Sequence, residues 1–183
     1  MRLRFDRQKS PIGTMLLATN DQDVLYSLDF EDFEPRMHKL LKRYYGNVQL
    51  ERGNVAMPIR AALENYFAGD FAAFAGLAVG AGGTDFQRDV WNRLRNISAG
   101  QTMSYGDLAA EVGRPSASRA VGLANGANPV AIVVPCHRVI GSNGALTGYG
   151  GGLPRKRWLL DHERAIVEST GHSQLGLFAE TAS

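Results

Sequence analysis

The regular hydrophobic pattern of this chain breaks most clearly in FAAFAGLAVGAGG, at residues 71–83, and this break limits the possible folds more than any other feature. Helical periodicity stops there, and the last eight residues of the stretch contain four glycines. Glycine-rich segments without periodicity typically connect folded units. We therefore predict an N-terminal domain over 1–80, a second domain over 84–168 and a disordered tail over 169–183.

The first of these segments has the pattern of an α/β domain. GTMLLATN and VLYSLDF are strand-like runs joined by a polar turn at 21–23, which predicts a β-hairpin. A helix is expected over 35–46, where a proline stands at the start and a glycine at the end. NVQLERG predicts a further strand, and MPIRAALENYFAG predicts a second helix.

The second segment predicts mostly helices. Thr84 and Gln87 form a capping box in front of FQRDVWNRL, and Ser104 with Asp107 repeats the device before YGDLAAEVG. SASRAVGLANGA predicts a short helix of small residues, so two short helices joined by a tight turn favour a helix-turn-helix. PVAIVV predicts a buried strand, and a last helix is expected to begin at Pro154.

Composition excludes several classes of protein. The start MRLRFDRQKS has no long apolar run, so we expect no signal peptide, and no apolar stretch approaches the roughly 18 residues that a membrane span requires. One cysteine allows no internal disulfide, and the four histidines lack metal-ligand spacing. We therefore expect a cytoplasmic protein without metal, cofactor or membrane partner.

Charge is distributed unevenly although the net charge is only +2. Residues 1–80 contain ten basic and ten acidic side chains, whereas residues 112–160 contain six basic ones and no acidic one. A long segment of one sign suggests a surface that faces an anion. A solvated basic face without a partner is the alternative.

The only cysteine, Cys136, lies in VVPCHRVIG. A free cysteine often only fills space in a core, which is one interpretation. The other is a reactive thiol: Pro135 suits the first position of a helical turn, whose N-terminus would lower the pKa of Cys136. His137 is placed to accept the thiol proton, directly or through a water, and Glu163 is the best candidate to orient that histidine.

Several longer motifs occur in one order: FQRDVWNRLRNI, SYGDLAAEVGRP, SRAVGLANGANP, NPVAIVVPCHRVIG, GALTGYGGG and RKRWLLDHE. Together they resemble the active-site region of the O6-alkylguanine-DNA alkyltransferases (methylated-DNA–protein-cysteine methyltransferases), from Thr84 to about Glu163. Over residues 1–80 the resemblance is looser, to the N-terminal domain of the constitutive bacterial members. It implies a ribonuclease H-like α/β domain, followed by a mostly α domain with a winged-helix-like helix-turn-helix.

The resemblance implies DNA repair by direct reversal. The alkyl group of O6-alkylguanine in double-stranded DNA would pass irreversibly to Cys136, once per protein, after the base has been flipped out of the duplex. A monomer without cofactors is implied. The alkyl groups that are preferred and the use of O4-alkylthymine stay open.

Catalytic positions follow from the same resemblance. His137 and Glu163 would draw off the proton of Cys136 with a bridging water, and Asn128 would tie the recognition helix to the active-site loop. Tyr105 would crowd the target phosphate and offer a proton to the base.

Further positions are implied for DNA and base. Arg119 would enter the duplex and fill the gap left by the flipped nucleotide. The remaining DNA contacts would come from Tyr105, Gly106, Arg114 and Ser142, and the base pocket would be bordered by Val139, Tyr149 and Gly150. Some relatives carry serine where this chain has Gly150, so one hydrogen bond to the alkylated oxygen would differ. Zinc-bearing relatives use N-terminal Cys and His ligands that this sequence lacks.

Two other functions fit part of the pattern. A thiol hydrolase or acyl transferase would use Cys136, His137 and Glu163 but leave the helix-turn-helix and the basic segment without a role. A DNA-binding regulator would use those two features and keep Cys136 as a structural residue.

Overall fold

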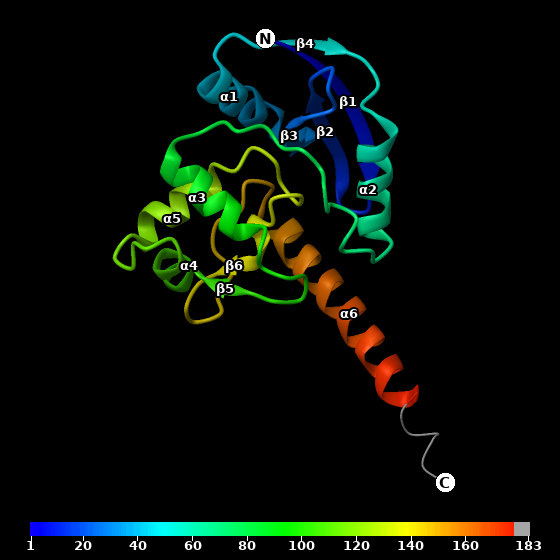
Figure 1. Ribbon diagram of the computed structural model, residues 1–183, viewed down its shortest axis with the longest axis vertical. Helices are drawn as coiled ribbons and strands as arrows, with labels where there is room; N and C mark the ends of the chain where they lie inside the picture. The colour runs from blue at the N-terminus through cyan, green and yellow to red at the C-terminus, as the bar shows by residue number, and fades with distance from the viewer. Residues whose placement is uncertain (178–183) are drawn as a thin grey trace.

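The computed structural model of the chain describes residues 1–177 and places a four-stranded sheet beside a group of helices (Figure 1). The sheet has the strand order β3-β2-β1-β4. Its strands are β1 (Arg2–Ser10), β2 (Gly13–Thr19), β3 (Leu25–Phe30) and β4 (Gln49–Arg52). Neighbours β1, β2 and β3 pair antiparallel, whereas β4 runs parallel to β1. An N-terminal sheet and a C-terminal helical part therefore make up a mixed α/β molecule.

The predicted hairpin is confirmed as β2 and β3, but β1 was not predicted. Its sequence, RLRFDRQKS, buries only Leu3 and Gln8, so the alternation that marks a half-buried strand is weak. Pairing with β2 along most of its length holds this polar strand in the sheet.

The two faces of the sheet are covered differently. Leu16 and Ala18 pack on one face against α1 (Glu34–Tyr45), through Met37 and Leu41. The alternate β2 residues Met15 and Leu17 face a larger cluster that contains α2 (Met57–Phe67) and the C-terminal helices. This alternation follows from the two-residue period of a strand.

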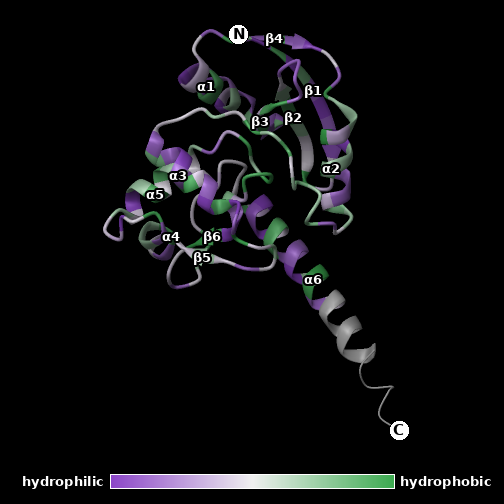
Figure 2. Cartoon of the chain, in the orientation of Figure 1, coloured by the Kyte–Doolittle hydropathy of each residue, from purple (hydrophilic) through white to green (hydrophobic). Residues whose placement is uncertain are grey.

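The C-terminal helices are α3 (Asp85–Leu94), α4 (Tyr105–Glu111), α5 (Ser118–Gly126) and α6 (Leu153–Leu177). Two short strands, β5 (Met103–Ser104) and β6 (Val139–Ile140), pair parallel between them. Both predicted caps are present, because Gln87 N–H donates to Thr84 Oγ1 and Asp107 N–H donates to Ser104 Oγ. In Figure 2, α1 and α3 mix hydrophilic and hydrophobic residues along their length, as helices with one buried stripe do.

The glycine-rich segment before α3 is packed against the sheet. Val79 forms a bridge with Leu25, so this segment continues the edge of the sheet beside β3. A Cβ at Gly80 would lie 2.7 Å from the Tyr26 ring, and one at Gly83 would lie 2.8 Å from Trp91. Glycine therefore permits close packing here, and one hydrophobic cluster includes residues from both sides of the segment.

The prediction of a strand in PVAIVV is wrong. Val130 makes a single bridge to Leu28, and the next residues turn, with Val134 N–H donating to Val130 O. Ile132 has a φ of 67°, a conformation that β-branched residues rarely adopt. The run is apolar because it is buried, and burial alone does not distinguish a strand from a compact buried turn.

The last helix, α6, begins with Pro154 near its start, as expected, and continues to Leu177. Residues 169–177 were predicted to have no regular structure, but no proline interrupts the helix after Pro154. Positions 178–183 of the predicted tail lie outside the described residues. Among the helices of residues 1–177, none is long and apolar enough to cross a membrane.

Candidate active site

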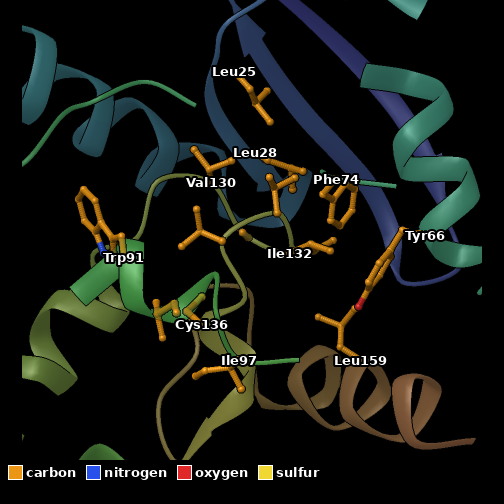
Figure 3. Packing of buried hydrophobic residues seen from close by; sticks show 14 of the residues in the cluster. Leu25, Leu28, Tyr66, Phe74, Trp91, Ile97, Val130, Ile132, Cys136 and Leu159 are labelled. Atoms are coloured by element: carbon orange, nitrogen blue, oxygen red, sulfur yellow. The ribbon is translucent and has the colours of Figure 1, made fainter. Parts of the chain in front are cut away.

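Cys136 lies in the core, where the buried turn meets the C-terminal helices (Figure 3). It begins a three-residue 3₁₀ turn, Cys136–Arg138, and is only 4% exposed. Its Sγ accepts a hydrogen bond of 3.1 Å from Asn128 Nδ2. The thiol is therefore held inside the protein by a specific polar contact.

Asn128 organises the turn that carries this cysteine. Its Nδ2 donates to Val134 O at 2.8 Å, and its Oδ1 accepts from Val130 N–H at 3.0 Å. One buried side chain thus fixes both ends of the turn and contacts the sulfur. The strained φ of Ile132 persists because these contacts determine the backbone around it.

His137 and Glu163 form a buried pair. His137 Nε2 lies 2.8 Å from Glu163 Oε1, and neither side chain is exposed. Burial lowers the pKa of His137, although the hydrogen bond and the charge of Glu163 oppose this shift. The imidazole is therefore neutral at pH 7, with Nε2–H donating to the carboxylate and Nδ1 left as an acceptor.

The carboxylate of Glu163 has three further donors. Arg138 donates to both of its oxygens, at 2.9 and 2.8 Å, Tyr66 O–H donates at 2.7 Å, and Gly100 N–H lies at 3.4 Å. Burial alone would raise the pKa of Glu163, but the hydrogen bonds from His137 and Arg138 and the charge of Arg138 hold it well below its usual value. Glu163 is therefore a carboxylate that orients the histidine.

The thiol of Cys136 does not have the lowered pKa that the sequence suggested. Burial raises its pKa, and the hydrogen bond from Asn128 offsets only part of this effect. Pro135 precedes the turn and is not its first residue, and three residues are too few to supply a substantial helix dipole. At neutral pH Cys136 is therefore a neutral thiol in this structure.

Three buried polar atoms near Cys136 have no hydrogen-bond partner among the described residues. They are His137 Nδ1, Tyr149 Oη and Asn125 Oδ1. The rings of His137 and Tyr149 lie 6.5 Å apart, and Asn125 Nδ2 donates to Cys136 O at 3.1 Å. Most buried polar atoms in folded proteins are paired, so three such atoms around one thiol indicate a place for a polar ligand or water.

The loop that follows β6 is tied over this region. Tyr105 O–H, from the start of α4, donates to Thr147 O at 2.9 Å. Lys156 is fully buried and donates to Val139 O at 2.6 Å and also to Thr147 O and Gly148 O. Burial lowers the pKa of Lys156 to about 8.

The predicted base-pocket residues lie under and within this loop. Val139 is fully buried, and Gly150 packs so closely that a Cβ there would lie 2.4 Å from the Arg36 guanidinium. Arg36 in turn donates to Asp29 and to the carbonyl oxygens of Gly126 and Asn128. It thereby links the sheet to the end of α5.

The residues predicted to contact DNA lie at the surface. Arg119, in the first turn of α5, and Arg114, in the turn before it, are exposed, and so are Gly106 and Ser142. A Cβ at Gly106 would meet only Ser104 Oγ, at 3.7 Å, so the start of α4 is open.

The basic segment does not form one outward-facing surface. Arg138 binds Glu163, Lys156 binds backbone carbonyls, and Arg155 donates to Asp32 and lies 4.3 Å above the Phe30 ring. Half of its six basic side chains therefore act inside the protein. Charge counting alone could not distinguish them from Arg114, Arg119 and Arg157, which are exposed.

Sequence reasoning missed five residues that shape the site: Arg36, Tyr66, Asn125, Arg138 and Lys156. Tyr66 lies in the helix predicted from MPIRAALENYFAG, and Arg138 and Lys156 were counted as part of the basic segment. No local pattern signals that Tyr66 contacts a carboxylate 97 residues away. Among the side chains that the structure describes, in residues 1–169, no group of three or more His, Cys, Asp and Glu residues could hold a metal ion.

A buried thiol that is followed in the chain by a neutral histidine, itself oriented by a carboxylate, is an arrangement found in proteins that use cysteine as a nucleophile. Comparison with known proteins defines the family. Residues 85–165 match the sequence profile of the 6-O-methylguanine DNA methyltransferase, DNA binding domain. A methylated-DNA–protein-cysteine methyltransferase of Salmonella typhimurium is 48% identical over 169 residues, which cover 91% of this chain and 99% of the relative.

A relative of the same name from Mycolicibacterium paratuberculosis is 48% identical over 85% of this chain and 88% of its own length. The crystal structure of Mycobacterium tuberculosis OGT in complex with DNA matches with a TM-score of 0.74 and 41% identity, covering 91% of this chain and 94% of that one. The chain therefore belongs to the methylated-DNA–protein-cysteine methyltransferase family.

Proposed function

We propose that this protein repairs alkylated DNA by taking the alkyl group of O6-alkylguanine onto Sγ of Cys136. The observation that carries this proposal is the geometry of the thiol: Asn128 holds it, and the only cysteine of the chain stands beside a neutral histidine with a free Nδ1. The relatives at 48% identity are named for transfer from methylated DNA to a protein cysteine. DNA repair, DNA binding and alkyl transfer are the functions that this family membership carries.

The reaction is a displacement at carbon. Sulfur forms a bond to the alkyl carbon, and the bond from that carbon to O6 of guanine breaks. The thiol proton passes through a bridging water to Nδ1 of His137, and the imidazolium is stabilised by Glu163. Guanine recovers one proton at its ring, so no net proton is gained or lost. We assign this proton to the hydroxyl of Tyr105, which would first release Thr147 O.

One transfer exhausts the protein. The product is a thioether, which has no leaving group that water could displace under mild conditions, and Cys136 is the only thiol of the chain. The protein is therefore consumed stoichiometrically.

A base within a duplex cannot reach a buried sulfur, so the target nucleotide must leave the stack. We assign this extrusion to α5, where Arg119 would occupy the vacated space and exposed Ala120 and Gly126 would permit close approach to the backbone. Arg114, Gly106 and Ser142 are proposed as backbone contacts, since all three are exposed.

The flipped base would enter beneath the loop that Tyr105 and Lys156 hold, between Val139, Tyr149 and Gly150. Cys136 is only 4% exposed, so this loop has to move before the base can enter. The Arg36 guanidinium fills the space that a serine side chain at position 150 would need.

The finer structural assignments are proposals too. We propose a ribonuclease H-like N-terminal domain over 1–80, supported by three antiparallel strands and a parallel fourth. The domain over 84–168 would be winged-helix-like, with α4 and α5 as the helix-turn-helix. We propose a monomer, as the family resemblance implies, and a free thiol acceptor suits the reducing cytoplasm.

The two alternative functions predict different results in an assay. A thiol hydrolase would turn over repeatedly on an ester or peptide, and a regulator would bind DNA without chemistry. Incubation with duplex DNA that contains O6-methylguanine, followed by mass spectrometry, distinguishes all three. We expect the Cys136 peptide to gain about 14 Da, the mass of a methyl replacing hydrogen. Binding without a mass change would favour the regulator.

A further inference from the structure

Asn125 is a buried side chain of the last turn of α5 whose role the reaction described above does not require. It is 2% exposed, and its Nδ2 donates to the carbonyl oxygen of Cys136 at 3.1 Å. The amide therefore lies against the same residue that supplies the nucleophile.

This contact fixes which way the amide points. The atom that lies 3.1 Å from a carbonyl oxygen has to be the donor nitrogen, because two oxygens at that distance would repel each other. Oδ1 consequently points away from Cys136 O. It is buried and has no hydrogen-bond partner among the described residues.

A buried amide oxygen without a donor is unfavourable, so the arrangement calls for a partner that the free protein does not supply. The neighbouring donors are already used. Tyr105 O–H donates to Thr147 O, and Asn128 Nδ2 serves Val134 O and the Cys136 sulfur. The missing partner of Asn125 is therefore a hydrogen-bond donor that arrives from outside.

Alkylation of O6 leaves guanine with few donors. N1 of the alkylated base carries no hydrogen, N9 is bound to the sugar, and N7 is an acceptor, so the 2-amino group holds the only N–H donors of the base. O4-alkylthymine has none, and its O2 is an acceptor. A buried acceptor beside Cys136 and Tyr105 can thus recognise one alkylated base and disfavour the other.

We propose that Asn125 is a specificity-determining residue, whose Oδ1 accepts a hydrogen bond from the 2-amino group of the extruded alkylguanine. This inference rests on the proposed alkyl transfer and adds to it the group that reads the base. Its Nδ2 keeps Cys136 O in place at the same time, so one amide joins recognition of the base to the position of the nucleophile.

The test compares two substrates that differ only in the amino group. Single-turnover rates are measured with oligonucleotides that contain O6-methylguanine or O6-methylhypoxanthine, in duplex and as single strands to remove effects of base pairing. The wild-type protein should favour methylguanine by about tenfold or more, since an unpaired buried acceptor is costly. Asn125→Leu, of similar volume but without donor or acceptor, should bring the ratio of the two rates close to one.

The ratio of the two rates distinguishes a role of Asn125 in base recognition from a purely structural role. In Asn125→Leu, loss of the hydrogen bond to Cys136 O would lower the rates of transfer from both substrates by the same factor. If the leucine variant does not fold, Asn125→Ala is measured in the same way. Leu123→Ala is the matched control on the same helix, because Leu123 is 77% exposed and its ratio should stay at the wild-type value.

An equal rate on both substrates for the wild type, or an unchanged ratio in both Asn125 variants, would overturn the proposal for Asn125. A wild-type protein that transfers from neither substrate would instead contradict the alkyl-transfer function.

Discussion

The buried turn around Cys136 and the exposed surface of α4 and α5 differ in how complete they are in the free protein. At the turn, Asn128 already contacts Cys136 and His137 already contacts Glu163, and three buried polar atoms nearby have no hydrogen-bond partner among the described residues. On the surface, Arg114 and Arg119 are exposed, and the Arg114 guanidinium lies 5.4 Å from the centre of the Phe86 ring. The buried groups are thus preorganised, whereas the exposed arginines, which we propose as DNA contacts, have fewer contacts of their own.

The comparison predicts that mutations separate into two classes. Changes at the turn should remove chemistry or stability and leave DNA affinity nearly intact. Changes on the surface should weaken DNA binding or base extrusion and leave the unfolding free energy and the transfer step unchanged.

The largest expected effect is that of Cys136→Ala. We expect no alkyl transfer at all, because the chain has no other thiol, and a dissociation constant for duplex DNA within about threefold of wild type, since Cys136 is buried. A transfer assay and a DNA-binding titration on the same preparation check this. Residual transfer would show that another side chain accepts the alkyl group.

Glu163→Gln should be the most destabilising change at the turn. It leaves Arg138 buried beside a neutral amide, and breaking a buried ion pair typically costs about 3–5 kcal/mol of unfolding free energy. Urea denaturation measures the difference. In the wild type the same contribution is present above the usual carboxyl pKa and is lost as the pH falls toward the lowered pKa of Glu163.

Tyr66→Phe is the milder comparison, since it removes one donor to Glu163 and should cost about 1 kcal/mol. Equal losses from both variants would mean that the carboxylate is not the centre of this network.

On the surface, Arg119→Ala should slow repair in duplex DNA by about tenfold or more, because extrusion of a stacked base costs a few kcal/mol. Transfer from the free base O6-methylguanine should stay near the wild-type rate, and so should the unfolding free energy. Rates on both substrates and one denaturation curve are needed. Equal losses on duplex and free base would argue against an extrusion role.

The pH dependence of transfer should be small near neutrality. Burial lowers the pKa of His137 below its usual value of about 6.5, so the imidazole can accept a proton throughout the neutral range. We expect similar rates at pH 7 and 8 and a decline only as the pH falls below the usual imidazole pKa. A rate that rises about tenfold from pH 7 to 8 would indicate attack by a free thiolate, since burial raises the pKa of Cys136.

Local patterns predicted the parts of the fold that local physics determines. The hairpin β2–β3, the caps of α3 and α4 and the short helix α5 all follow from spacing and capping chemistry. PVAIVV was misassigned because its turn is imposed by the Asn128 side chain, a contact that hydrophobicity does not encode.

The site was predictable to a similar extent. Adjacency placed His137 beside Cys136, but the contact of Glu163 with Tyr66 and Arg138 depends on how α2 and α6 pack. The prediction of a lowered cysteine pKa was wrong because sequence reasoning saw the possible turn and could not see the depth of burial.

The measurement that tests the central claim most directly is the end point of the reaction with excess methylated duplex. We expect the amount of repaired guanine to stop at about one equivalent per protein molecule, to scale with protein concentration, and to match the amount of S-methylated Cys136. Repair that continues past one equivalent, or that ends with Cys136 unmodified, would contradict the claim that this buried thiol is an alkyl acceptor used once.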